Sequence, residues 1–115
     1  MTDGDSQRRE PPGSTAGDPT GDPHRHEREV KIANRLGLHA RPAAEFVKLA
    51  GGYVADIRVE KDGMEVNGKS IMGVLTLAAE RGTRMKIRGH GHDAVEAVDA
   101  LAGLVQRGFD YESAG

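Results

Sequence analysis

Four stretches of the chain alternate apolar and polar residues with the period of two that is typical of a half-buried strand. Their apolar positions are Val30 and Ile32, Ile57 and Val59, Met64 and Val66, and Met85 and Ile87. The dipeptide Asp62-Gly63 separates the second stretch from the third and is typical of a tight hairpin turn. Because each stretch has one apolar and one polar side, the pattern predicts an antiparallel sheet with one face in water.

Two longer stretches have apolar residues at the spacing of an α-helix instead. The first has its apolar residues at positions 43, 46, 47 and 50. This helix is expected to begin at about Ala40, directly after His39, and to end at the glycine pair 51–52. The second covers residues 94–105. It follows Asp93, and Glu96 comes three residues later, which predicts a capping box at the start of this helix.

A shorter apolar run at residues 71–77 lies between the third and fourth strands. We expect a short helix there, with Ser70 at its entrance and the serine hydroxyl capping the first backbone N–H groups. The order of elements is then strand, helix, strand, strand, helix, strand, helix (βαββαβα). This order predicts an α+β fold in which a four-stranded antiparallel sheet carries three helices on one face.

The first 28 residues differ from the rest of the chain. They hold four of the five prolines, and their only apolar residues are Met1 and Ala16. Such a segment cannot bury enough apolar surface to offset the conformational entropy lost on ordering. We therefore expect residues 1–28 to be a disordered N-terminal extension, residues 29–112 to form one folded domain, and residues 113–115 to be a short C-terminal tail.

Composition argues against several classes of function. The formal net charge is −2, so nothing in the charge favours binding to nucleic acid. The chain has no cysteine and no apolar stretch near the roughly 18 residues of a membrane span, and its N-terminus lacks the apolar core of a signal peptide. We therefore expect a cytoplasmic protein that neither enters a membrane nor binds nucleic acid.

Four of the histidines fit solvated positions better than metal sites. His24 and His26 lie in the predicted extension, and His90 and His92 lie in the turn before the last helix. No cysteine and no set of acids with fixed spacing accompanies them, so we expect no bound metal.

The fifth histidine, His39, stands where a helix entrance normally has Ser, Thr, Asp or Asn. The unpaired N–H groups and the dipole of a helix start favour an anion and disfavour an imidazolium, so the ring keeps a lone pair that can attack. Arg41 adds a planar cation suited to phosphate, Pro42 costs nothing in the first turn, and Gly37 allows a tight turn before the ring. This combination predicts reversible phosphoryl transfer through a covalent phosphohistidine. Residues 63–70 (GMEVNGKS) match the letters of the GxxxxGK[ST] nucleotide-binding motif. The predicted hairpin turn and third strand occupy residues 62–66, so these residues do not form the loop between a strand and a helix that the motif requires. We therefore expect no cofactor and a phosphoryl group that moves between proteins.

Two motifs in this sequence resemble one known family. Residues 37–43 (GLHARPA) closely resemble the active-centre motif of HPr, the histidine-containing phosphocarrier of the bacterial sugar phosphotransferase system. Residues 69–75 (KSIMGVL) resemble the regulatory serine motif of the same family, at the family's mutual spacing. The resemblance covers about residues 29–112 and implies the HPr-like open-faced sandwich, in agreement with the predicted order of elements.

The resemblance also implies roles for individual residues. His39 would accept a phosphoryl group on Nδ1 from phosphorylated enzyme I and pass it to the IIA domains of sugar permeases, and Arg41 would neutralise the phosphate. Ser70 would be phosphorylated by HPr kinase/phosphorylase where that enzyme exists. The implied partner-binding surface consists of Ala40, Ala44, Lys48, Ile71, Met72 and Leu75. Such a carrier is expected to be a monomer with no turnover of its own.

Two other functions compete with the carrier. The first is an HPr-like regulatory module, either of a nitrogen-related branch or one that only binds partners, with no role in sugar uptake. Members of the family that lack the active histidine exist, whereas His39 and Arg41 are both present here. The second is a small RNA-binding domain, and the absence of clustered aromatic residues argues against it.

Overall fold

The structure, a computed structural model, describes residues 24–109, so most of the predicted extension and the C-terminal tail lie outside the described residues. Its elements are β2 (Arg25–Lys31), α1 (Ala40–Ala50), β3 (Asp56–Lys61), β4 (Met64–Asn67), α2 (Ile71–Thr76), β5 (Arg84–His90) and α3 (Ala94–Gln106). The predicted order of elements is confirmed. No helix within residues 24–109 has the length and apolar character needed to cross a membrane.

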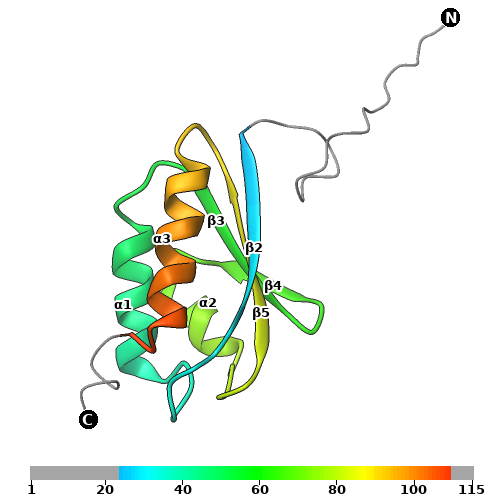
Figure 1. The fold of residues 1–115 in the computed structure, drawn as a ribbon, viewed down its shortest axis with the longest axis vertical. Coiled ribbons are helices and arrows are strands. Elements are labelled where there is room, and N and C mark those ends of the chain that lie inside the picture. The colour runs from blue at the N-terminus through cyan, green and yellow to red at the C-terminus, as the bar shows by residue number, and fades with distance from the viewer. Residues whose placement is uncertain (1–23, 110–115) are drawn as a thin grey trace, which may run out of the picture.

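The strands form one antiparallel sheet in the order β2-β5-β3-β4, and all three helices cover the same face of it (Figure 1). The predicted hairpin joins β3 to β4. Asp62 and Gly63 both have positive φ values, 52° and 84°, as the favoured two-residue hairpin turns require. The predicted α+β architecture is therefore confirmed, with the open face of the sheet on the side away from the helices.

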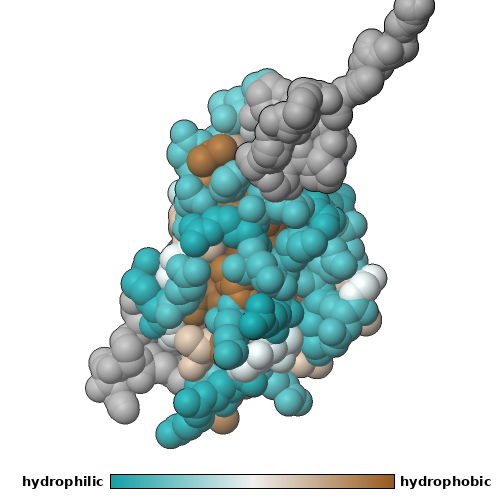
Figure 2. All heavy atoms as spheres, turned by 45° about the vertical axis from the view of Figure 1, so that its right-hand side comes forward, coloured by the Kyte–Doolittle hydropathy of each residue, from teal (hydrophilic) through white to brown (hydrophobic). Residues whose placement is uncertain are grey.

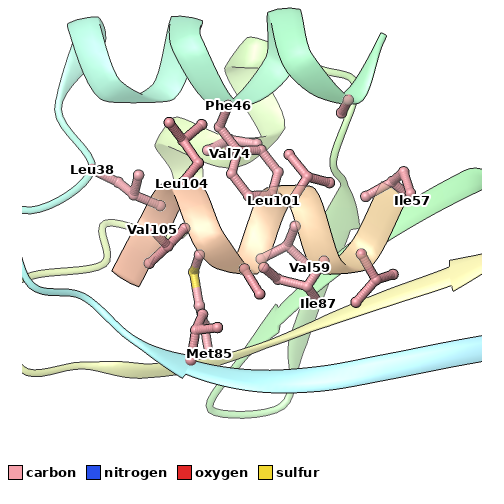
Figure 3. Close-up of a cluster of buried hydrophobic side chains, with 14 of the residues drawn as sticks. Leu38, Phe46, Ile57, Val59, Val74, Met85, Ile87, Leu101, Leu104 and Val105 are labelled. Carbon is pink, nitrogen blue, oxygen red and sulfur yellow. The ribbon is translucent and has the colours of Figure 1, made fainter. Parts of the chain in front are cut away.

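The core lies between the sheet and the helices (Figure 3). Phe46 of α1 and Leu101 of α3 are fully buried, and they meet Val59 and Ile87 from the two central strands. Val59 and Ile87 are directly paired in the register of β3 with β5. The alternation of apolar and polar residues along the sequence thus places the predicted apolar positions of the central strands against the helices.

The open face of the sheet carries a network of charges centred on Arg88. Its guanidinium donates to Glu27 of β2 (Nε–Oε1 3.1 Å), to Glu60 of β3 (Nη2–Oε1 3.0 Å) and to Glu65 of β4. The hydrogen bond to Glu27, above all, raises the pKa of Arg88 above its ordinary value. Figure 2, in which the right-hand side of Figure 1 comes forward, shows mainly hydrophilic residues there. One arginine thus links all three other strands on the wet face.

The first strand begins earlier than the sequence predicted. The predicted start of the folded domain was residue 29, whereas β2 begins at Arg25. Residues 25–28 contain no apolar side chain, but their backbone pairs with β5, from Arg25 opposite His90 to Arg28 opposite Ile87. On the helix side, His26 Nε2 lies 3.1 Å from Asp99 of α3. Hydrophobic alternation could not detect this segment, because backbone pairing and polar contacts hold it in place.

The predicted capping box of the last helix is wrong. Asp93 is the N-cap residue of α3, but its side chain caps no N–H group of that helix. Its carboxylate instead accepts hydrogen bonds from the backbone N–H groups of Val54 (2.9 Å) and Ala55 (2.8 Å). Asp93 therefore ties the loop after α1 to the start of α3. These backbone hydrogen bonds, first that of Val54, hold the pKa of Asp93 below its ordinary value.

This contact makes the stability of the fold depend on pH. The pKa of Asp93 is lower in the folded state than in the unfolded state. The ionised carboxylate therefore contributes fully to the stability of the fold above the unfolded pKa of about 4, and this contribution is lost as the pH falls through the lower, folded pKa. We expect Asp93→Asn to be less stable than the wild type at pH 7 and to approach the wild type near pH 2. Urea unfolding of both proteins at the two pH values measures this difference. An equal gap at both would contradict the assignment.

Candidate functional site

His39 is the N-cap residue of α1, which begins at Ala40 as predicted. Its backbone is extended (φ −79°, ψ −171°), and its carbonyl oxygen accepts the first helical hydrogen bond from Ala43 N at 3.0 Å. The imidazole itself makes no capping hydrogen bond. The backbone of His39 therefore takes part in the helix start, whereas its ring does not, so the ring can react without breaking a capping hydrogen bond.

One nitrogen of this ring is covered. Nε2 of His39 is buried and has no hydrogen-bond partner among the residues that the structure describes. The residue as a whole is half-buried. Nδ1 is thus the ring nitrogen that is left for a reaction partner arriving from solvent, and it is also the nitrogen that the family resemblance implied.

The first turn of α1, which follows the ring directly, contains a basic residue and no acidic one. Pro42 is buried and Arg41 is exposed. The positive end of the helix dipole thus lies at His39, and Arg41, two residues later, adds a cation to the same turn. An anion attached to the ring would be stabilised by both.

The loop before His39 is pressed against the segment that follows α2. Gly37 has φ +72°, and a Cβ atom there would lie 2.4 Å from the carbonyl oxygen of Ala79. The next residue, Leu38, is buried and donates from its N–H to the same oxygen at 2.8 Å. The predicted tight turn at Gly37 is confirmed, and the close contact with Ala79 is a second reason for glycine at this position.

Ser70 is the N-cap residue of α2, as predicted. Its Oγ accepts a hydrogen bond from Gly73 N at 3.1 Å, and its carbonyl oxygen accepts from Val74 N at 3.0 Å. The hydroxyl is thus part of the helix start rather than a free surface group. A group attached to this oxygen would sit at the positive end of α2.

The other end of α2 is held by Lys61, which the sequence did not single out. Its Nζ donates to the carbonyl oxygens of Leu77 (2.9 Å) and Ala78 (3.4 Å), just beyond the last turn. A cation at a helix C-terminus is favourable, but Lys61 lies at the end of β3 and is distant in sequence. No local motif could have revealed this contact.

The implied partner-binding residues lie on two helices that pack against each other (Figure 1). Ala40, Ala44 and Lys48 are exposed at intervals of four residues, which places them along one side of α1. On α2, Met72 is 69% exposed and Ile71 is 38% exposed, whereas Leu75 is half-buried and packs against the core.

Leu36 is a further exposed apolar residue that the sequence reasoning missed. It is 65% exposed and lies three residues before His39. The residues around it follow neither the period of a strand nor that of a helix in their burial, so no hydrophobic periodicity in the sequence identifies Leu36. A single exposed apolar side chain is common on protein surfaces, so Leu36 alone does not define a docking surface.

A groove of about 610 Å³ lies elsewhere, along the seam between α1 and α3. Its lining residues are Glu45, Lys48, Leu49, Gly52, Tyr53, Leu104 and Arg107. His39 is not among them, so this groove does not bring a small molecule to the ring. Among residues 24–109 no group of histidines and acids is arranged to hold a metal ion.

The comparisons with known proteins agree with this geometry. A family model described as the PTS HPr component phosphorylation site matches residues 26–107, nearly all of the described chain. The chain belongs to the HPr family. Among curated HPr relatives, the phosphocarrier protein HPr of Cupriavidus necator is 42% identical over 83 residues, which are 72% of this chain and 93% of the relative. The HPr-like protein Crh of Bacillus subtilis is 44% identical over 80 residues, 70% of this chain and 94% of the relative.

Solved HPr structures also match the fold. The crystal structure of HPr-C-His from Thermoanaerobacter tengcongensis has a TM-score of 0.72 and 44% sequence identity, and the match covers 75% of this chain and 97% of that one. The HPr-like open-faced sandwich expected from the sequence is therefore confirmed, and with it the membership in a family of phosphotransferase-system carriers.

Proposed function

We propose that this member of the HPr family accepts a phosphoryl group on Nδ1 of His39 from phosphorylated enzyme I and passes it to IIA domains of sugar permeases. The observation that carries the proposal is the His39 ring itself, which stands at a helix entrance without capping it and has its other nitrogen covered. In the accepting step, the Nδ1 lone pair attacks phosphorus while the bond between phosphorus and the donor breaks. The passing step is the same exchange with the IIA domain as acceptor.

The surroundings of the ring support transfer between proteins. Arg41 and the start of α1 favour the anionic phosphoryl group, and the acid-free first turn adds no repulsion. We propose that partners dock on the exposed residues of α1 and α2 next to the site. These are Ala40, Ala44, Lys48, Ile71 and Met72, together with the half-buried Leu75.

Incubation with enzyme I and phosphoenolpyruvate tests the proposal directly. We expect intact-mass spectrometry to find one added phosphoryl group, which is lost in acid because a phosphorus–nitrogen bond is acid-labile. Transfer from the purified adduct to a IIA domain would then complete the relay. An active enzyme I that leaves the mass of the protein unchanged would refute the carrier function.

We further propose that Ser70 is phosphorylated by HPr kinase/phosphorylase in a host that has this enzyme. A phosphate on Oγ would keep a favourable position at the helix start, so the fold should persist. It would also add about two negative charges next to the exposed apolar residues Ile71 and Met72. Docking of enzyme I should weaken, because the charge would disfavour the complementary contact.

Ser70→Asp mimics part of this effect. We expect the rate of phosphoryl transfer from enzyme I to fall by about tenfold or more, since about 1.4 kcal/mol of lost docking energy is a tenfold change. Ser70→Asn is the matched control, because asparagine also caps a helix start but carries no charge. Initial rates for the two variants separate charge from capping. Equal rates would show that negative charge at Ser70 does not regulate transfer.

A regulatory role is the second candidate function. It is favoured by the similarity to Crh of Bacillus subtilis, which one solved structure describes as the catabolite repression HPr. In that case the surface on α1 and α2 would bind a regulatory partner, and phosphoryl transfer through His39 would not serve sugar uptake. The relay to a IIA domain discriminates between the two candidates, because only the carrier needs it.

We expect the protein to work as a monomer, although dimers occur among similar proteins. A Thermoanaerobacter tengcongensis HPr structure with 45% identity and a TM-score of 0.60 is described as a dimer. Sedimentation at the concentration of the transfer assay tests the expectation. Activity that depends on a dimer would overturn it.

A further inference from the structure

Asn34 is exceptional among the described residues. It is 2% exposed, and within residues 24–109 it is the one polar or charged residue that is buried. It lies in the loop between β2 and α1, five residues before His39. A buried amide costs free energy unless hydrogen bonds compensate for the water that it has lost. Its position therefore needs an explanation beyond packing.

The amide of Asn34 holds the turn that leads to His39. Its Nδ2 donates to the carbonyl oxygen of Gly37, and its own backbone oxygen accepts from Gly37 N at 3.2 Å. Both polar backbone groups of Gly37 are thus bound by a single residue. Since Gly37 has φ +72°, in the left-handed region that glycine adopts readily, these two bonds hold its backbone in that conformation.

The constraint continues from Gly37 to the ring. Leu38 is buried and is anchored to Ala79 by its N–H, and His39 follows immediately as the helix N-cap. The backbone that carries the imidazole is therefore fixed on one side by α1 and on the other by the turn that Asn34 holds. A small change in this turn would displace the ring, and a displacement of about 1 Å can cost a hundredfold in rate.

The hydrogen bonding of Asn34 is incomplete, which argues against a purely stabilising role. Its Oδ1 is buried and has no hydrogen-bond partner in the protein among residues 24–109. An unpaired buried acceptor opposes folding. Of the two polar groups of the amide, the NH2 group is the one that binds the turn, because a carbonyl oxygen such as that of Gly37 needs a hydrogen-bond donor.

We propose that Asn34 is a positioning residue for phosphoryl transfer, which acts by holding the Gly37 turn so that the His39 ring presents Nδ1 to partners. The inference rests on the proposed carrier function of His39. Asn34 does not touch the phosphoryl group, and its effect passes through the backbone of residues 37–39. It should therefore alter the geometry and reactivity of the ring more than the stability of the fold.

Asn34→Ala removes the amide donor and is the primary test. We expect the initial rate of phosphoryl acceptance from enzyme I to fall by about ten- to a hundredfold. The NMR titration midpoint of His39 should also move, because the ring changes its position relative to the start of α1. Asn34→Ser, whose hydroxyl is a donor on a shorter side chain, should give a smaller loss of rate and keeps the test valid if Asn34→Ala does not fold.

Val59→Ala is the matched control for stability. It removes two methyl groups from the fully buried core far from the loop, so its melting temperature should fall while the His39 titration stays unchanged. Wild-type rate and wild-type titration in Asn34→Ala would overturn the inference. So would a loss of rate that merely follows the fraction unfolded, as in Val59→Ala. A wild type that accepts no phosphoryl group would instead refute the carrier function itself, and the titration would still report whether Asn34 positions the ring.

Discussion

His39→Ala is expected to abolish phosphoryl acceptance and leave the fold intact. The ring supplies the only lone pair proposed to attack phosphorus, and alanine has no replacement for it. The cost in stability should be small, about 1 kcal/mol or less, because the imidazole makes no capping hydrogen bond and is only half-buried. The mass of the protein after incubation with enzyme I and phosphoenolpyruvate measures acceptance, and thermal unfolding measures the fold.

His92→Ala is the control for the chemistry. His92 is exposed and lies in the turn before α3. The loop that carries His39 lies near the other, C-terminal end of α3 (Figure 1). We expect it to accept the phosphoryl group as the wild type does. An acid-labile adduct on His39→Ala would show that another nitrogen is the acceptor and that His39 has been assigned the wrong role.

Gly37→Ala is expected to destabilise the fold strongly and to disturb the site at the same time. Alanine would have to adopt φ +72°, and its Cβ would lie 2.4 Å from the carbonyl oxygen of Ala79, a distance that real Cβ atoms do not reach. The left-handed conformation costs about 1–2 kcal/mol, and displacing the backbone of a packed segment costs about 1–3 kcal/mol more. We therefore expect a loss of about 2–5 kcal/mol in the free energy of unfolding, measured by denaturant titration.

Gly82→Ala separates the two causes. Gly82 has a similar positive φ of +85°, but a Cβ atom there would meet nothing within 4 Å. It should lose only the conformational part, about 1–2 kcal/mol, and its His39 should accept the phosphoryl group normally. If both variants lose the same stability, the contact between Gly37 and Ala79 does not constrain the loop.

Local rules predicted the features that depend on neighbours in sequence. The hairpin at Asp62-Gly63, the start of α1 after His39 and the cap at Ser70 all follow from residue types with strong conformational preferences, and all are present in the structure. The alternation also predicted the strands, but in β4 Met64 is 48% exposed, so of its two predicted apolar positions only Val66 packs against the core. These features could be recognised because each depends on a single residue type or on a short repeat of apolar and polar residues.

The features that the sequence could not reveal depend on distant partners. Asp93 has the residue type and spacing of a capping box, yet its carboxylate instead accepts from two backbone N–H groups that lie 39 and 38 residues earlier in the chain. Residues 25–28 look like extension because only pairing with β5 makes them a strand. Lys61 and Asn34 act through backbone carbonyls, and no pattern of side chains marks such a contact in advance.

The early start of β2 determines where anything joined to the N-terminus enters the domain. His24 is tied to the turn after β5 through the bond from Gly91 N to its carbonyl oxygen, 2.8 Å long. The seven residues of β2 then run the length of the sheet, on the order of 20 Å, before the chain turns towards His39 (Figure 1). An affinity tag, a fluorophore or a sensor surface attached upstream of His24 would thus be anchored at the far end of the sheet. Immobilisation through the N-terminus should leave the His39 face open to its partners, which makes that end the one to choose for binding measurements.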